Sequence, residues 1–158
     1  IEKIDNAMKR AIKFSKEQYN STVKYVKSVD ADKEVHIGET GWASVSNGFY
    51  GNNGSKATDE YKQGLYYKLM REWTDNAGIS CFYFEAFNEK WKDAHNPAGS
   101  ENHFGLFKIN GEAKYPIWDL VDKGIFKGLK RNGNTITKTY NGNIKELMPH
   151  VLVPATKH

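Results

Sequence analysis

The chain has 158 residues, of which 39% are hydrophobic, 13% aromatic and 27% charged. This composition is typical of a globular domain, because disordered chains are poor in aromatic residues. No apolar run approaches the ~20 residues of a membrane helix, so we expect no membrane span. The formal net charge of +4 is spread along the chain and not clustered, so we expect no nucleic-acid partner. The single cysteine, Cys81, excludes an intrachain disulfide and a multi-cysteine zinc site.

Residues 1–28 carry apolar side chains at intervals of three, four and seven, which predicts one amphipathic helix. In the segment that follows, Val35, Ile37 and Glu39 share one face of an alternating pattern. We therefore predict a short strand that ends at Glu39. Residues 40–55 are rich in glycine and asparagine and are predicted to form a long loop.

The second helix is predicted to begin after Thr58, whose hydroxyl can cap it, and to end near Gly78. Residues 79–86 are nearly all apolar, which is typical of a strand covered on both faces. A second loop is predicted over 87–104.

The Asn110-Gly111 pair predicts a small hairpin over 105–115, because this dipeptide suits a tight turn. Pro116 can open a third helix that runs to about Phe126. The sequence does not predict how the tail after Gly128 packs.

The order of these elements, with each strand followed by a crossover helix, indicates an α/β fold with parallel strands. Two strands do not make an independent sheet covered on both faces. We therefore expect the chain to belong to a larger α/β body. It begins with Ile1 and not with methionine, which supports the expectation of a processed or excised piece.

Carboxylates close both predicted strands, Glu39 the first, and Glu85 with Glu89 the second. Catalytic groups of parallel α/β folds lie in the loops at the carboxyl ends of the strands. A pair of carboxylates at ~5–5.5 Å hydrolyses glycosides with retention, and aromatic side chains stack on sugar rings. The same spacing also suits solvated or lysine-paired carboxylates, so it does not separate the two interpretations.

Three motifs favour the catalytic interpretation. Gly-Glu-Thr-Gly-Trp-Ala-Ser at 38–44 resembles the nucleophile motif of glycoside hydrolase family 17, the β-1,3-glucanases and related glucanosyltransferases. Phe-Tyr-Phe-Glu-Ala-Phe-Asn-Glu-Lys-Trp-Lys at 82–92 is similar to the eighth-strand motif of that family, and the segment 101–116 resembles the one that follows it.

The resemblance implies the C-terminal portion of a (β/α)8 TIM barrel, strands seven and eight with their helices, which acts on β-1,3-glucan with retention. Glu39 would be the nucleophile. Substrate-binding roles would fall to the remaining charged and aromatic side chains of the motifs: Trp42, Glu85, Glu89, Trp91, Lys92, Glu101 and Phe104. No pair of histidines in the sequence has the spacing of metal ligands and no glycine-rich phosphate loop is present, so we expect no metal and no cofactor.

In the family the general acid is a glutamate of strand four, in an Asn-Glu motif. The Asn88-Glu89 pair of this chain aligns with strand eight instead. A whole barrel needs ~250 residues. We therefore expect residues 1–128 to form the C-terminal part of the barrel, 129–158 to pack on it as an extension, and a complementary N-terminal barrel chain to supply the acid.

Three other interpretations stay open at this point. The chain could be a non-catalytic β-glucan-binding fragment, or part of a glucanosyltransferase. A purely structural role is a third. Because β-1,3-glucan is extracellular or wall-bound, the resemblance also implies a secreted or cell-envelope protein.

Overall fold

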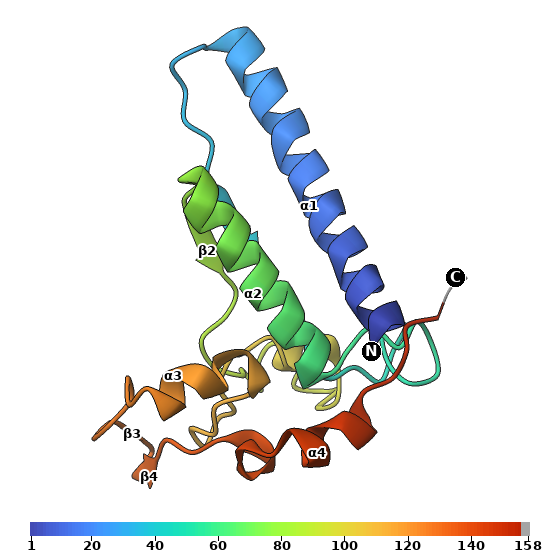
Figure 1. Cartoon of the computed structure of the whole chain (residues 1–158), viewed down its shortest axis with the longest axis vertical. Helices are drawn as coiled ribbons and strands as arrows, with labels where there is room; N and C mark the ends of the chain where they lie inside the picture. Colours follow the sequence, from blue (N-terminus) through green and yellow to red (C-terminus); the bar gives the residue numbers. More distant parts are fainter. Residues whose placement is uncertain (156–158) are drawn as a thin grey trace.

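The computed structural model describes residues 1–155, in which two long helices lie side by side over a two-stranded parallel sheet (Figure 1). The main chain elements are α1 (Glu2–Val29), β1 (Ile37–Thr40), α2 (Glu60–Ala77) and β2 (Cys81–Tyr83). The C-terminal third adds α3 (Trp118–Asp122), the hairpin strands β3 (Lys130–Arg131) and β4 (Asn134–Thr135), and α4 (Ile144–Leu147). Short 3₁₀ turns cover Ser100–Asn102, Tyr115–Ile117, Thr139–Gly142 and Met148–His150.

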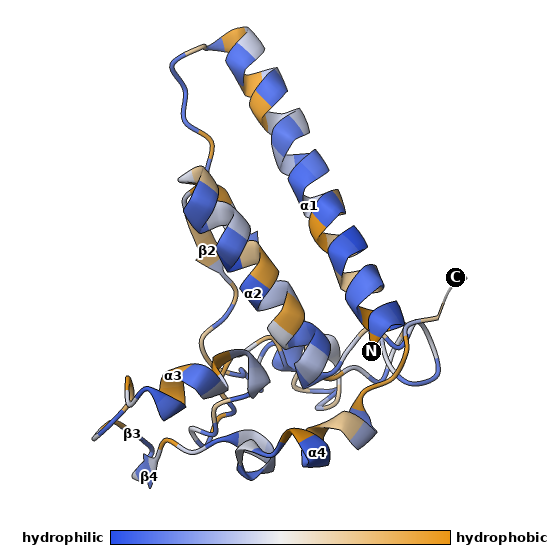
Figure 2. Ribbon diagram, in the orientation of Figure 1, coloured by the Kyte–Doolittle hydropathy of each residue, from blue (hydrophilic) through white to orange (hydrophobic). Residues whose placement is uncertain are grey.

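The two long helices meet through the apolar stripe that the sequence predicts. Ile4, Met8 and Ile12 of α1 pack on Tyr66 and Met70 of α2, and all five side chains are buried. Hydrophilic residues lie between the hydrophobic ones along both helices, as expected for helices with one side facing solvent (Figure 2). The predicted first helix is therefore confirmed almost residue for residue.

The second helix begins one residue later than predicted. Asp59 and not Thr58 is the capping residue, because its carboxylate accepts the backbone N–H of Lys62 at 2.8 Å. The hydroxyl of Thr58 instead donates to the carbonyl of Tyr50 at 3.1 Å. The predicted end of α2 is confirmed, since Gly78 adopts the left-handed conformation that glycine tolerates best.

Strands β1 and β2 are parallel and joined through α2, which confirms the predicted strand-helix-strand unit. Both are shorter than predicted, and a register irregularity falls between Ile37 and Thr40. Within residues 1–155 this sheet has only two strands, so each strand keeps one open edge. The described chain is thus a partial α/β unit, as its length leads one to expect.

The last third differs most from the predicted elements. The hairpin expected over 105–115 reduces to a tight turn with one antiparallel bridge, Phe107 to Ala113. The third helix stops at Asp122 and not near Phe126. The segments after it gather beneath the first turn of α2, at the end of the molecule where the strands also end (Figure 1). Of the predicted extension 129–158, residues 156–158 lie outside the described part.

Candidate active site at the strand ends

The loops that leave β1 and β2 run in close contact from their first residues. The backbone N–H of Phe84 donates to the carbonyl of Thr40 at 2.7 Å. A Cβ at Gly41 would lie 2.0 Å from the carbonyl oxygen of Phe84, so only glycine permits this approach. The two predicted catalytic segments therefore begin at the same edge of the sheet.

A cluster of two carboxylates and one ammonium group follows β2. Nζ of Lys92 lies 3.5 Å from Oε2 of Glu85 and 3.2 Å from Oε2 of Glu89. The same ammonium group lies 3.7 Å from the ring centroid of Phe84. Three of the predicted site residues are thus brought together, and the aromatic ring shields the lysine from solvent on one side.

Glu85 is the carboxyl group of this cluster that holds a proton most tightly. Burial is the main cause that raises the pKa of Glu85, and its hydrogen bond to Glu89 adds to it, so that the pKa reaches about 7 despite Lys92. The pKa of Glu89 is lowered, chiefly because its carboxylate accepts that hydrogen bond. Below about pH 7 the pair therefore shares one proton, located mainly on Glu85.

Glu39 occupies the third position of β1 and is exposed. No hydrogen bond or ion pair engages its carboxylate within residues 1–155. It borders a cavity of about 340 Å³ between β1 and α1, shared with Tyr19 and Trp73, and not the cavity that Glu85 and Glu89 line. The structure thus places Glu39 at the predicted strand end, but does not gather it with Glu85 and Glu89 in one cavity.

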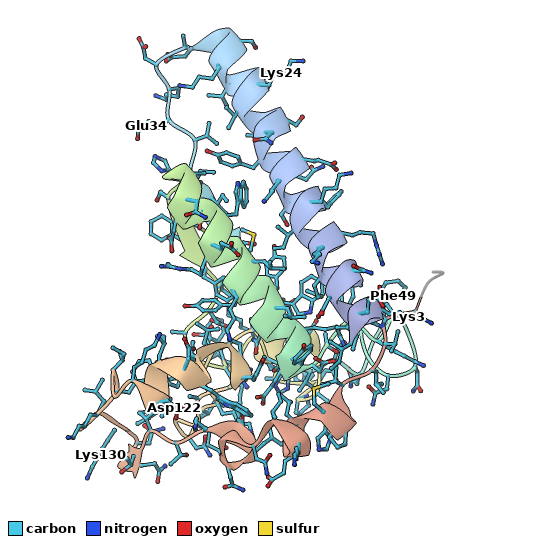
Figure 3. All side chains as sticks on the ribbon, in the orientation of Figure 1. Lys3, Lys24, Glu34, Phe49, Asp122 and Lys130 are labelled. Carbon is cyan, nitrogen blue, oxygen red and sulfur yellow. The ribbon has the colours of Figure 1, made fainter. Side chains whose placement is uncertain are left out.

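The other predicted residues divide between two further cavities. Trp42, Glu101 and Phe104 line one of about 470 Å³, whereas Trp91 lines a second of about 450 Å³ with Glu85 and Glu89. The first is also bordered by Phe49, which is labelled in Figure 3. Trp91 is 72% exposed, so its indole is available to a ligand.

Trp42 has a structural role besides any contact with substrate. Its indole N–H donates to the carbonyl of Ala57 at 2.9 Å, and its ring lies 5.0 Å from that of Tyr66. One edge of the indole is therefore anchored on α2 and on the end of the long loop, while Trp42 still borders the cavity of Glu101 and Phe104.

The first turn of α2 holds a group of buried polar side chains that the sequence does not reveal. The amide Nε2 of Gln63 donates to the carbonyls of Trp42, Phe104 and Gly105 at 2.9, 3.0 and 3.2 Å. One side chain thus ties the loop after β1 to the loop after β2. Polar residues in a helix are usually solvated, and no sequence signal marks Gln63 as an exception.

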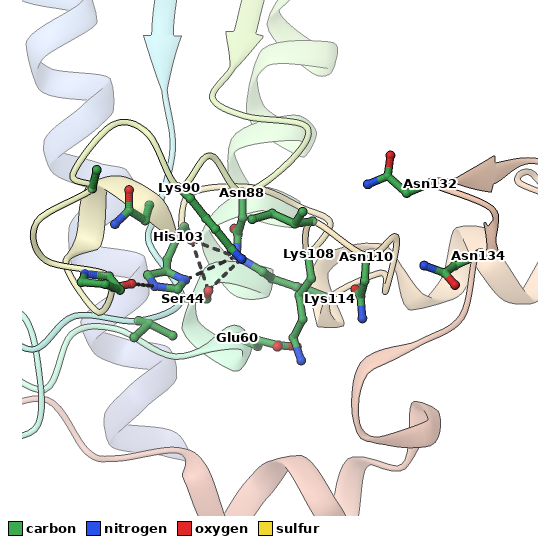
Figure 4. A pocket seen from close by; sticks show the side chains of 15 residues that line it. Ser44, Glu60, Asn88, Lys90, His103, Lys108, Asn110, Lys114, Asn132 and Asn134 are labelled. Atoms are coloured by element: carbon green, nitrogen blue, oxygen red, sulfur yellow. Dashed lines mark hydrogen bonds between the residues drawn. The ribbon is translucent and has the colours of Figure 1, made fainter.

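A buried lysine, Lys114, also joins the same two loops (Figure 4). Nζ of Lys114 donates to Oγ of Ser44 and Oδ1 of Asn88 at 2.8 Å each, and to the carbonyl of His103 at 3.2 Å. Lys114 is 1% exposed, and burial lowers its pKa to about 7. Its three hydrogen-bond acceptors are neutral groups, and through them the lysine positions the loops.

Glu60 completes this buried polar group. Its Oε2 accepts the hydroxyl of Thr139 at 2.6 Å and the backbone N–H of Tyr115 at 3.2 Å, and burial raises its pKa. The C-terminal segments are therefore attached to α2 directly beneath the site.

Two classes of site find no support in the described part of the chain. Within residues 1–155, no group of three or more His, Cys, Asp or Glu side chains gathers as a metal ion would require. None of the helices there is both long and apolar enough to cross a membrane.

Comparison with known proteins gives consistent matches. The model of the family described as glycosyl hydrolases family 17 matches residues 22–118. Glucan 1,3-beta-glucosidase of Arthroderma benhamiae is 35% identical over 96 residues, which are 56% of this chain and 29% of that protein. Glucan 1,3-beta-glucosidase of Saccharomyces cerevisiae is 34% identical over 86 residues, or 51% of this chain and 25% of that protein.

A solved structure matches nearly the whole chain. The endo-laminarinase from Formosa Hel1_33_131 is 60% identical, with a TM-score of 0.95, over 99% of this chain and 40% of that one. The chain therefore spans less than a third of the two curated relatives and two fifths of the laminarinase.

Proposed function

Because the chain belongs to glycosyl hydrolases family 17, we propose that it is the nucleophile-bearing part of an enzyme that cleaves β-1,3-glucan with retention of configuration. The family and the laminarinase structure imply a TIM-barrel glycosidase, of which the described residues are a partial unit. Within that barrel, β1 and β2 would be strands seven and eight. The observation that carries the proposal is the position of Glu39 at the end of β1, beside a strand whose own end carries the Glu85–Glu89–Lys92 cluster.

In the proposed reaction, a carboxylate oxygen of Glu39 attacks the anomeric carbon of one glucose unit. The bond to the leaving oxygen breaks, and a protonated carboxyl group transfers its proton to that oxygen. Water then attacks the covalent glycosyl-enzyme, and the two inversions together give retention. The exposure of Glu39 and its lack of an ion pair within residues 1–155 suit this role, because its oxygens are free to react.

The cluster after β2 would bind the substrate next to the reacting bond. The carboxylate of Glu89 can accept hydrogen bonds from sugar hydroxyls, and Lys92 can donate to them. Trp91 offers an exposed ring on which the apolar face of a glucose unit can stack. Trp42, Glu101 and Phe104 would line a neighbouring glucose-binding position.

The general acid would come from the rest of the barrel. Side chains that a complete barrel would cover are exposed here: Phe14 and Tyr25 on α1 and Phe82 on β2. Phe82 lies on the sheet face turned away from the helices, because its neighbours Cys81 and Tyr83 pack against the helical core. These exposed side chains and the open edge of β1 fit contacts with the remaining strands and helices of the same barrel. Since the substrate is an extracellular or wall polymer, we propose that the protein acts outside the cell or in the envelope.

Product analysis tests this function directly. The whole protein that contains this chain would be incubated with laminari-oligosaccharides, and the products followed by mass spectrometry and by proton NMR of the first anomer formed. We expect shorter oligosaccharides whose new reducing end is first β. Longer products would indicate transfer to another sugar in place of hydrolysis. Tight binding with no product would show a glucan-binding protein, and an α anomer would exclude retention.

A further inference from the structure

The hairpin β3–β4 lies outside the segment 22–118 that the family model covers, yet it borders the candidate site. Arg131 of β3 lines the cavity of about 450 Å³ that also contains Glu85, Glu89 and Trp91. The next residues of the hairpin, Asn132 and Asn134, line the adjoining cavity of about 730 Å³ around Lys114 (Figure 4). The two cavities adjoin, because both are lined by Asn88, Lys90 and Ile109, and hairpin residues line each of them.

The turn and base of the hairpin are built to hold this position. Asn132 and Gly133 both have positive φ angles, 50° and 81°, as a tight two-residue turn requires. At the base, the backbone N–H of Ala113 donates to the carbonyl of Thr137 at 2.7 Å, and that of Thr139 donates to the carbonyl of Ala113 at 2.9 Å. These bonds join the hairpin to the segment that follows the site.

Arg131 itself is held by two contacts. Its guanidinium carbon lies 4.1 Å from the ring centroid of Phe87, which stacks in turn on Phe107 at 5.1 Å. A Cβ at Gly111 would lie 2.8 Å from the Cβ of Arg131, so the absence of a side chain there lets the hairpin come close. Stacking fixes the plane of the guanidinium group and leaves its N–H donors directed along that plane.

Those donors are free for a ligand. Within residues 1–155, the guanidinium group of Arg131 makes no hydrogen bond and no ion pair. It shares its cavity with the carboxyl groups of Glu85 and Glu89, which offer acceptors for hydroxyl groups, and with an exposed tryptophan, which favours a ring with apolar faces. A neutral sugar, with hydroxyls at its rim and C–H groups on its faces, satisfies both conditions.

We propose that Arg131 is a specificity-determining residue that binds the hydroxyls of a glucose unit stacked on Trp91. The hairpin thereby adds a binding position beyond the segment that matches the family, and the enzyme prefers oligosaccharides long enough to reach it. This inference rests on the proposed function, and it specifies which part of the substrate the C-terminal extension contacts.

The test compares three variants of the whole protein on laminari-oligosaccharides of increasing length. Arg131→Met keeps an unbranched stem over Phe87 but removes every donor, and Arg131→Lys keeps the charge without the planar fork. Lys130→Met is the matched control, because Lys130 lines neither cavity and lies at the outer edge of the hairpin (Figure 3). Unfolding temperatures would establish that all three variants fold.

We expect Arg131→Met to lower kcat/KM about tenfold on the long oligosaccharides, the effect of losing a charged hydrogen bond, and to leave the shortest cleaved oligosaccharide unchanged. Arg131→Lys should lose most of the same preference, and Lys130→Met none of it. An Arg131→Met variant with the same length preference as the unmodified protein would overturn the inference, while normal cleavage would still support the proposed function.

A binding measurement covers the case in which the unmodified protein cleaves nothing. The NMR signal of the Arg131 Nε–H group is expected to shift when a long laminari-oligosaccharide is added, and to stay in place when the shortest one is added. No shift with either ligand would refute the role of Arg131, whatever the catalytic result.

Discussion

Glu85 shows most clearly how surroundings decide the chemistry of a single residue in this chain. Its carboxyl group is largely buried beside Lys92 and Glu89, and one of its oxygens, Oε1, is buried without a hydrogen-bond partner within residues 1–155. Burial and the neighbouring carboxylate outweigh the lysine, so the pKa rises from its ordinary value of 4.5 to about 7. A protonated carboxyl group at neutral pH is a hydrogen-bond donor, which its sequence position alone does not reveal.

This raised pKa makes folding stability depend on pH. Between about pH 4.5 and 7, Glu85 keeps its proton in the folded chain and loses it in the unfolded chain. Its stabilising contribution is therefore complete below pH 4.5 and is lost as the pH rises through 7. We expect Glu85→Gln, which stays neutral, to gain in unfolding free energy relative to the unmodified chain over this range and to level off above it.

Denaturant unfolding at a series of pH values measures this difference. Taking the variant minus the unmodified chain cancels the contributions of shifted groups that Glu85 does not influence, such as His103. The control is Glu72→Gln, the same change on an exposed residue of α2. A difference curve that is flat from pH 4.5 to 7 would show that Glu85 titrates normally.

At the scale of elements, side chains of α2 hold the loops of the candidate site together. The first turn of α2 is capped by Asp59, joins the loops after β1 and β2 through Gln63, and attaches the C-terminal segments through Glu60. Lys62 is also buried there. It pairs with Asp59 and donates to the carbonyl of Leu152 at 2.7 Å. The orientation of both loops therefore depends on polar side chains of a helix that contributes no predicted catalytic residue.

The variant Gln63→Met tests whether α2 holds these loops in place. The substitution preserves the size of the side chain but leaves the carbonyls of Trp42, Phe104 and Gly105 without their shared donor. We expect the free energy of unfolding to fall by about 2 kcal/mol, because unsatisfied buried carbonyls are costly. Gln18→Met, on an exposed position of α1, should change it by less than about 0.5 kcal/mol. Equal effects of the two substitutions would mean that Gln63 does not hold the loops.

The elements that the sequence predicts well are those whose signals are local. Apolar periodicity finds α1, and Gly78 ends α2, because these features depend on one segment at a time. The hairpin β3–β4 is missed, since its four strand residues are exposed and show no alternation. The pair Asn132-Gly133 is the one local signal that could have indicated it. The role of Lys114 could not be predicted, because its three acceptors come from three distant segments.

At the scale of the whole molecule, the candidate site is exposed to solvent because the sheet has only two strands within residues 1–155 and does not close into a barrel. Two parallel strands carry Glu39 and the Lys92 cluster to one edge, but the cavities beside them remain separate within residues 1–155. The exposed ring of Phe82 on β2 marks the face that further strands of a barrel would cover. We therefore expect closure of the barrel to unite these cavities into one cleft, with the acid opposite Glu39.

The role of Glu39 as nucleophile is the centre of this account, and one comparison tests it most directly. In the whole protein, Glu39→Gln keeps the size of the side chain and removes the attacking carboxylate. Glu34→Gln makes the same change on an exposed residue of the preceding segment. With laminari-oligosaccharides we expect Glu39→Gln to lower kcat at least about a thousandfold with an unchanged unfolding temperature, and Glu34→Gln to stay near the unmodified rate. A Glu39→Gln variant that cleaves at a near-normal rate would contradict the account.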